Sequence, residues 1–220
     1  MVILPMNARR IFALFVLIFA TIACQVSSSI SGGTVEPGGV LFQDDFSNPN
    51  SGWDKVTKDD GLTNYVDGAY RILVNQANMD IWANPGLKFD DVRIEVDAVK
   101  MAGPDDNDFG VTCRSQDENH FYFFIVSSDG YYGIGKISGD QQSLIGMDAM
   151  QPSETIKQGA ASNHIRADCV GDSLSLYVNG EKLASANDSE YSNGDVGLIA
   201  GAFDTTGTDI HFDNFSVLKP

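Results

Sequence analysis

From Val40 to the C-terminus, apolar and polar residues alternate in short runs that are separated by turn sequences. The run Ser173–Val178, for example, alternates serine or tyrosine with leucine or valine. Such period-two patterning places successive side chains on opposite faces of a β-strand. The strands predicted in this way lie at Val40–Phe46, Tyr65–Val66, Ala69–Val74, Met79–Ala83, Asp91–Lys100, Phe109–Arg114, His120–Ser127, Tyr131–Ile137, His164–Val170, Ser173–Val178, Lys182–Ala186, Gly194–Ala202 and Asp209–Leu218.

Tight turns join several of these strands. Two-residue turns that combine glycine with aspartate or asparagine favour β-hairpins. They occur at Asp67-Gly68, Asp129-Gly130, Gly171-Asp172 and Asn179-Gly180. Only Glu154–Gln158, with Ser153 as a cap, has the pattern of a short helix. The sequence therefore predicts an all-β fold, an antiparallel jelly-roll sandwich of two sheets, whose first and last strands pair and cover an edge.

The N-terminal residues have a different character. Two arginines precede the apolar run Ile11–Ile22, which is short for a membrane span, and small residues then lead to Cys24. This is the layout of a bacterial lipoprotein signal peptide, residues 1–23, whose removal leaves a lipidated Cys24. Thr21 stands where such signals usually have leucine, so a plain cleaved signal peptide is the alternative.

The remaining chain divides into a tether and a domain. Residues 24–39 are rich in serine and glycine and are predicted to form a flexible tether. Residues 40–220 have the length of one domain with a sizeable core. We therefore expect an exported protein that a lipid anchor holds at the extracytoplasmic face of the membrane, on a bacterial cell surface.

The charge of the chain excludes some partners. It carries 30 acidic and 14 basic residues, a formal net charge of −16. Such a surface repels phosphate groups, so nucleic acid is not an expected partner. For the same reason the membrane is expected to be contacted through the lipid anchor only.

Two cysteines remain after Cys24. Cys113 and Cys169 each share the parity of apolar residues in their predicted strands, so both sulfur atoms are expected to point into the core. The oxidising environment of an exported domain favours a disulfide between them. Two buried free thiols are the alternative.

Several short motifs are similar to those of a known superfamily. They are Asp44-Asp45-Phe46 with Trp53, Phe109-Gly110-Val111 with Cys113-Arg114, His120-Phe121-Tyr122, Asn163-His164-Ile165-Arg166, Leu176-Tyr177-Val178-Asn179-Gly180 and Phe212-Asp213-Asn214-Phe215. With them the domain resembles the concanavalin A-like lectin/glucanase superfamily, and within it the laminin G-like and 3-keto-disaccharide hydrolase-like domains of exported bacterial proteins. The resemblance implies a jelly roll, a fold that carries lectins, enzymes and adhesion modules alike.

One segment raises the question of catalysis. Arg93–Lys100 resembles the strand of laminarinase-type glycoside hydrolases that carries three carboxylates in the pattern Glu-x-Asp-x-x-Glu. Glu95 and Asp97 take the first two places, but Lys100 stands at the place of the acid/base. An ammonium group cannot alternate between proton donor and base at neutral pH. We therefore expect no catalytic residues, with Glu95 and Asp97 as the alternative.

A loop raises the question of a metal. The stretch Gly103–Asp108 gathers oxygen ligands, with Asp105, Asp106 and Asp108 as candidates for binding Ca2+. It lacks the spacing of an EF-hand, and solvated turn residues are the simpler interpretation. No cofactor is expected, and calcium is the alternative.

The aromatic residues favour a glycan ligand. His120–Val126 is apolar on both faces, and by parity Tyr122 and Phe124 are expected on the face that needs a covering loop or a ligand. Sugar rings stack on aromatic rings while polar side chains orient their hydroxyl groups. Trp82 and Tyr131 are possible additions to such a platform. The candidate contacts to carbohydrate are Trp53, Arg114, Tyr122, Tyr132, Asn163 and Arg166.

These observations lead to one function and two alternatives. We expect a surface-anchored, non-catalytic module that binds a glycan or polysaccharide. The first alternative is an enzyme of the 3-keto-disaccharide hydrolase type that uses Glu95 or Asp97. The second is a structural or adhesion lipoprotein whose partner is a protein.

Overall fold

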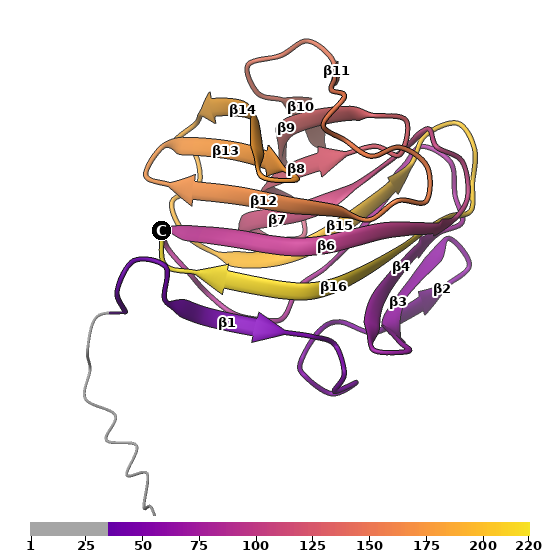
Figure 1. The fold of residues 1–220 in the computed structure, drawn as a ribbon, viewed down its shortest axis with the longest axis horizontal. Coiled ribbons are helices and arrows are strands. Elements are labelled where there is room, and N and C mark those ends of the chain that lie inside the picture. The colour runs from indigo at the N-terminus through magenta and orange to yellow at the C-terminus, as the bar shows by residue number, and fades with distance from the viewer. Residues whose placement is uncertain (1–34) are drawn as a thin grey trace, which may run out of the picture. The chain divides into compact units, whose positions relative to one another are not determined.

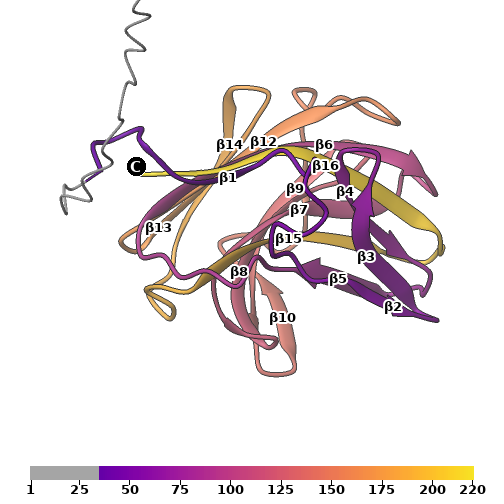
Figure 2. The same ribbon diagram turned by 90° about the horizontal axis from the view of Figure 1, so that it is seen from below.

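The computed structural model describes residues 35–220, which form two antiparallel β-sheets packed face to face (Figures 1 and 2). All elements in this range are strands, which confirms the predicted all-β sandwich. The range holds no helix that is long and apolar enough to cross a membrane. The predicted signal peptide, the anchor residue Cys24 and most of the predicted tether lie outside the described residues.

The larger sheet has nine strands, in the order β14-β13-β12-β6-β16-β4-β3-β2, with β1 beside β16. Its strands are β1 (Val40–Asp44), β2 (Val56–Lys58), β3 (Gly61–Val66), β4 (Ala69–Val74), β6 (Val92–Ala102), β12 (Asn163–Val170), β13 (Ser173–Val178), β14 (Glu181–Asn187) and β16 (Thr208–Leu218). Pairing of β1 with β16 confirms that the first and last strands meet. Just before β1, the N–H of Gly38 donates to the carbonyl of Lys219, and the N–H of Lys219 donates to the carbonyl of Gly39.

The smaller sheet has seven strands, in the order β10-β9-β8-β7-β15-β5, with β11 beside β9. Its strands are β5 (Met79–Ala83), β7 (Asn107–Asp117), β8 (His120–Val126), β9 (Tyr131–Ser138), β10 (Gln141–Leu144), β11 (Gln151–Pro152) and β15 (Asp195–Ala202). The short helix predicted at Glu154–Gln158 is a turn instead, in which the Ser153 hydroxyl accepts the N–H of Thr155 at 3.2 Å.

A disulfide joins the two sheets through the core. Cys113 of β7 and Cys169 of β12 are both fully buried and bonded to each other, as predicted from their parity. Each side chain lies among the apolar residues that the two sheets turn toward one another. The bond therefore ties the centre of one sheet to the centre of the other.

Strand β8 is buried on both faces, and the predicted parity of its aromatic residues was wrong. Tyr122 and Phe124 pack between the sheets, whereas Phe121 and Phe123 lie on the outer face of the smaller sheet. The reason is the register, because Tyr122 pairs with Cys113 across the ladder and cross-strand partners share a face.

The outer face of the smaller sheet is concave and filled. Gln142 of β10 donates a hydrogen bond from Nε2 to Oδ2 of Asp80 in β5 at 2.9 Å, although these strands stand at opposite edges of the sheet. Neighbouring strands lie ~4.8 Å apart, so side chains of the two edges meet only if the sheet curls. The curled sheet encloses an apolar group, here called the outer cluster: Phe121, Phe123, Ile125 and Ile199, covered by Trp82, Ile137, Leu144 and Met150.

Candidate functional site

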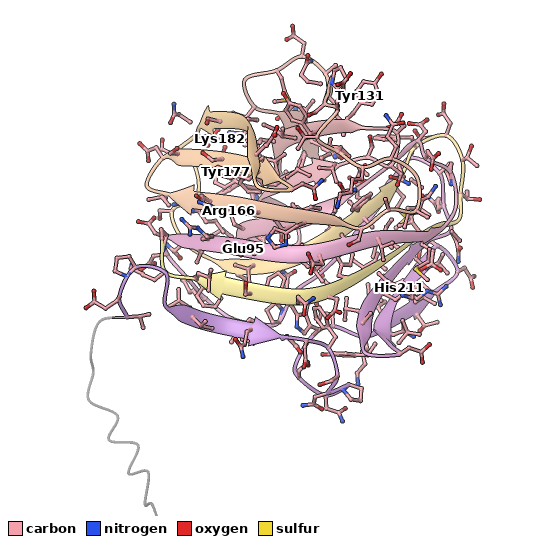
Figure 3. The ribbon with its side chains drawn as sticks, viewed as in Figure 1. Glu95, Tyr131, Arg166, Tyr177, Lys182 and His211 are labelled. Atoms are coloured by element: carbon pink, nitrogen blue, oxygen red, sulfur yellow. A yellow bond between two sulfur atoms is a disulfide. The ribbon has the colours of Figure 1, made fainter. Side chains whose placement is uncertain are left out.

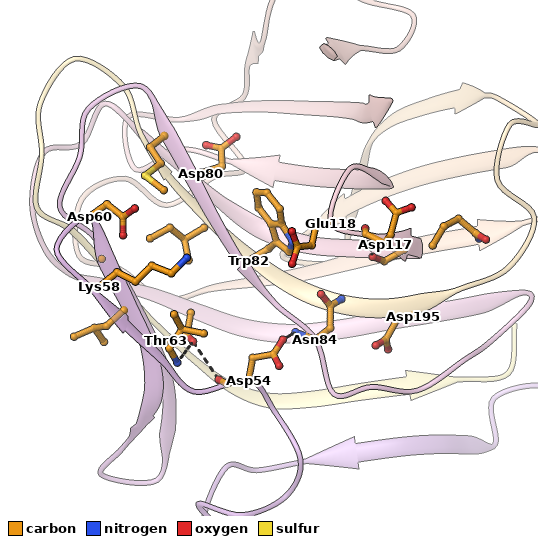
Figure 4. A pocket seen from close by; sticks show the side chains of 17 residues that line it. Asp54, Lys58, Asp60, Thr63, Asp80, Trp82, Asn84, Asp117, Glu118 and Asp195 are labelled. Atoms are coloured by element: carbon orange, nitrogen blue, oxygen red, sulfur yellow. Dashed lines mark hydrogen bonds between the residues drawn. The ribbon is translucent and has the colours of Figure 1, made fainter. Parts of the chain in front are cut away.

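A cavity of about 580 Å³ adjoins this concave face, and Trp82 of the outer cluster is one of the residues that line it. Strands β2, β3 and β5 line it, together with the end of β7 and the residue that follows. Figure 4 shows Trp82 in the middle of the lining, with Lys58 and Asp60 on one side and Asp117 and Glu118 on the other. The volume lies within the range of small-ligand sites.

The alternation of β5 presents Trp82 to this cavity. Ile81 and Ala83 pack toward the core between the sheets, so Trp82 projects from the opposite face of the strand. Its ring lies 5.2 Å from that of Phe121, between centroids, which holds the indole in place. The hydrogen bonds of the described residues include one from the indole N–H of Trp53 but none from that of Trp82. The Trp82 N–H is therefore open to a ligand.

Some acidic side chains of the lining support its walls. Asp195 accepts the backbone N–H groups of Gly86 at 2.9 Å and Leu87 at 3.0 Å. Asp117 accepts the N–H of Asn119 at 2.8 Å, and this bond lowers the pKa of the Asp117 carboxyl group. These carboxylates hold the loops that border the cavity in position.

Other polar groups of the lining are unused. Within residues 35–220, the side chains of Lys58, Asp60 and Glu118 make no hydrogen bond or ion pair. They supply one cationic donor and two anionic acceptors next to an indole ring. This combination suits a ligand that offers a flat apolar face and several hydroxyl groups.

Asp80 connects the cavity to a buried acidic pair. Asp80 of β5 and Asp108 of β7 flank Gly201 of β15 in the ladder. An oxygen of each lies within 2.6 Å of the point that a Cβ at Gly201 would occupy, so the two carboxyl groups are neighbours above the glycine. Asp108 is 2% exposed, and its Oδ1 has no hydrogen-bond partner. Burial raises the pKa of both carboxyl groups, and the charge of Asp80 raises that of Asp108 further.

The structure places four of the six predicted carbohydrate contacts inside the protein. Trp53, Arg114, Tyr122 and Asn163 are at most 3% exposed. Each is also engaged there: the Trp53 indole donates to Asp44 at 3.0 Å, for example, and the Tyr122 hydroxyl donates to Asp188 at 2.6 Å. These side chains hold the fold together and have no surface for a glycan, so we do not retain them as contacts.

The other two predicted contacts lie apart from the cavity. Tyr132 is half-buried against the core between the sheets. Arg166 lies on the outer face of the larger sheet, where its guanidinium stacks 4.2 Å above the centroid of Tyr177 and pairs with Asp168 at 2.5 Å. Figure 3 shows Arg166, Tyr177 and Lys182 on neighbouring strands of this open face. The predicted set therefore does not converge on one site.

The alternative catalytic pair lies on the same open face. Glu95 and Asp97 point outward from β6, and His164 of β12 stands opposite, 2.8 Å from Asp97 and 3.7 Å from Glu95. Lys100 has the opposite parity, is buried, and forms an ion pair with Asp105. The strand thus does not present three aligned groups to a cleft, and neither carboxylate lines the cavity beside Trp82.

The three candidate calcium ligands do not gather. Asp105 pairs with Lys100, Asp106 is exposed, and Asp108 lies buried beside Asp80. Among residues 35–220 no group of three or more His, Cys, Asp or Glu side chains is placed to hold a metal ion.

Comparisons with known proteins support the fold. No family model and no curated protein matches the sequence. Among solved structures, the carbohydrate-binding module CBM66 from Bacillus subtilis superposes with a TM-score of 0.62 at 19% identity, covering 76% of this chain and 96% of that one. A protein of unknown function with a galectin-like fold from Bacillus subtilis gives 0.61 at 11% identity, covering 84% and 98%. A GlcNAcα1-4Gal-releasing endo-β-galactosidase from Clostridium perfringens gives 0.59 at 11% identity, covering 86% and 65%. At these low identities the likenesses show the fold alone, a β-sandwich.

The sequence pattern indicates only one residue of this site, Trp82. Trp82 was only a possible addition to an aromatic platform, and Asp80, Lys58, Asp60 and Glu118 had no assigned role. A signal was present in β5, where Asp80 and Trp82 share one face and Met79, Ile81 and Ala83 share the other. The pattern in β5 does not show that β2 and β3 lie opposite this strand and form the other wall of the cavity.

Proposed function

We propose that the described domain is a non-catalytic carbohydrate-binding module whose glycan lies in the cavity beside Trp82. The observation that carries this proposal is an indole ring with an unpaired N–H in a cavity of about 580 Å³ bordered by unpaired Lys58, Asp60 and Glu118. The ring takes the C–H face of a sugar, and the polar groups orient its hydroxyls. The likeness to a carbohydrate-binding module agrees with this function, although the fold itself carries many functions.

We also propose that the module is displayed at the cell surface by a lipid on Cys24 and a tether. The placement of the cavity supports this arrangement. Strand β1 begins at one end of the sandwich, next to the C-terminus, whereas β2 and β3 lie toward the other end (Figures 1 and 2). A tether that joins the domain at Val35 would therefore be attached at the end of the sandwich opposite to β2 and β3, which leaves the cavity accessible.

The test is a glycan array with the purified full chain, followed by titration of the glycan that binds. Trp82→Ala is expected to weaken binding about tenfold or more, because stacking and the indole hydrogen bond are lost together. Intrinsic fluorescence gives a second readout. Of the two tryptophans, Trp53 is buried at 3% exposure and Trp82 stands in the cavity, so a bound glycan should protect Trp82 from a soluble quencher.

Tyr131→Ala is the matched control. Tyr131 is an aromatic residue with 40% exposure that does not line the cavity. Its replacement is expected to leave affinity unchanged. Equal affinity of the wild type and Trp82→Ala for every glycan on the array contradicts the proposal.

A further inference from the structure

The charge of the cavity narrows the class of glycan that fits it. Six of its lining side chains are acidic and one, Lys58, is basic: the acidic ones are Asp54, Asp60, Asp80, Asp117, Glu118 and Asp195. A uronic acid or a sulfated sugar would place further negative charge among these carboxylates. The cavity therefore disfavours anionic polysaccharides and favours a neutral or cationic ligand.

Asp80 belongs to this lining and forms an acidic pair with Asp108, which is buried and does not itself line the cavity. Asp80 Oδ2 accepts from Gln142, while its Oδ1 points to the space above Gly201, where the Asp108 carboxylate also lies. Asp108 Oδ1 is buried and unpartnered. A buried acceptor of this kind is costly unless a donor reaches it or its neighbour. Within residues 35–220 no cationic side chain forms an ion pair with either carboxylate.

The spacing between this pair and Trp82 suits a sugar. Asp80 and Trp82 lie two residues apart on the same face of β5, which separates their side chains by about 7 Å along the strand. A pyranose ring stacked on the indole spans most of that distance. One of its ring substituents then lies beside Asp80.

We infer that Asp80, with Asp108 directly behind it, is a subsite for an ammonium group, and that the ligand of the cavity is a glycan with unacetylated amino sugars. This inference rests on the proposed glycan-binding function. An ammonium group offers three donors and one positive charge, which complements the Asp80 Oδ1, an oxygen that accepts no hydrogen bond within residues 35–220, and the charge of the pair. A hard metal ion fits less well, because it needs six or more oxygen ligands and only two carboxylates meet here.

A matched series of ligands tests the inference. The β-1,4-linked trimers of glucosamine, N-acetylglucosamine and glucose share one backbone and differ only in the group at C2. Titration of the full chain at neutral pH, where the pair keeps more of its negative charge than in acid, is expected to show that the glucosamine trimer binds about tenfold tighter than the glucose trimer. Asp80→Asn and Asp108→Asn are each expected to abolish that preference and to leave affinity for the glucose trimer within about twofold.

Asp172→Asn is the control, because it removes one exposed carboxylate from a turn of the larger sheet that does not line the cavity. It should keep the preference of the wild type. The inference is overturned if the wild type binds the three trimers equally or if Asp80→Asn retains the preference. It is also overturned if spermidine, a cation without a sugar, competes as well as the glucosamine trimer. If none of the three trimers binds, the amino-sugar inference fails. The proposed function fails only if, in addition, no glycan on the array binds the wild type more tightly than Trp82→Ala.

Discussion

Gln142 and Asp80 form a hydrogen bond of 2.9 Å that joins the two edges of the smaller sheet across its concave face. In many sandwiches such a face is an open groove. Here the outer cluster fills it, and a Cβ at Gly135 would lie 2.2 Å from Cζ of Phe123, so only glycine lets that ring lie against the sheet. The consequence is that the open space adjoins the border of the concave face, where Trp82 stands, and not its centre.

We predict that Gln142→Ala loosens strand β10. The substitution removes the bond across the concave face and leaves a half-buried carboxylate oxygen of Asp80 without its donor, which costs about 1 kcal/mol. Hydrogen exchange should show lower protection of Gln141–Leu144, with little change in β12. Gln141→Ala is the control, since Gln141 is exposed and makes no side-chain hydrogen bond within the described residues. Unchanged protection of β10 in Gln142→Ala would show that the bond does not hold the edges together.

We predict that Asp108→Asn stabilises the protein at neutral pH. Burial and the neighbouring Asp80 raise the pKa of the Asp108 carboxyl group in the folded state above its value of about 3.9 in the unfolded state. The group then contributes stability below the unfolded pKa, and this contribution is lost as the pH rises through the folded pKa. Asparagine is uncharged, so Asp108→Asn does not lose this contribution to the free energy of unfolding as the pH rises.

The measurement is the free energy of unfolding in urea from acidic to neutral pH. The difference between Asp108→Asn and wild type should grow with pH and vanish toward the unfolded pKa. Asp106→Asn removes an exposed carboxylate just before β7 and should follow the wild-type curve. A pH-independent difference would contradict the raised pKa.

We predict that loss of the disulfide destabilises the domain strongly. Cys113 and Cys169 are separated by 56 residues and join the two sheets. In the loop-entropy account, release of a loop of this length costs about 4 kcal/mol. The double variant Cys113→Ala, Cys169→Ala should lower the urea midpoint accordingly, and reduction of the wild type should give the same shift. A loss below about 1 kcal/mol would mean that packing alone defines how the sheets sit together.

The strands could be predicted from sequence where alternation is regular and both faces are well defined. Ala69–Val74, Met79–Ala83 and Ser173–Val178 have the bounds that the pattern predicted. The missed strands are short and polar, such as β2 at Val56–Lys58, and they form because a neighbouring edge offers backbone partners. The disulfide could be predicted because each cysteine lies on the same face of its strand as apolar neighbours, which places both sulfur atoms in the core.

The residues of β8 alone do not show which face of this aromatic strand packs against the core. Every position from Phe121 to Val126 is apolar, so either set could have faced the core. The choice depends on the register with β7, which shifts at an irregularity between Cys113 and Asp117. The candidate site could not be predicted for a similar reason, since it also depends on how separate strands meet. Its two walls come from edges of different sheets, and no local pattern in β5 indicates that β2 and β3 lie across from Trp82.

The outer face of the larger sheet gives the last prediction. Arg166 and Tyr177 form an aromatic–cation stack there, which by its chemistry resembles a sugar platform. However, the Arg166 guanidinium is already paired with Asp168, and neither Arg166 nor Tyr177 lines the cavity beside Trp82. We therefore predict that Arg166→Ala and Tyr177→Ala leave affinity for the array-selected glycan within about twofold of wild type, whereas Trp82→Ala weakens it about tenfold. Titration of the three variants against one glycan decides between the faces, and a reversed order of effects would move the binding site to the larger sheet.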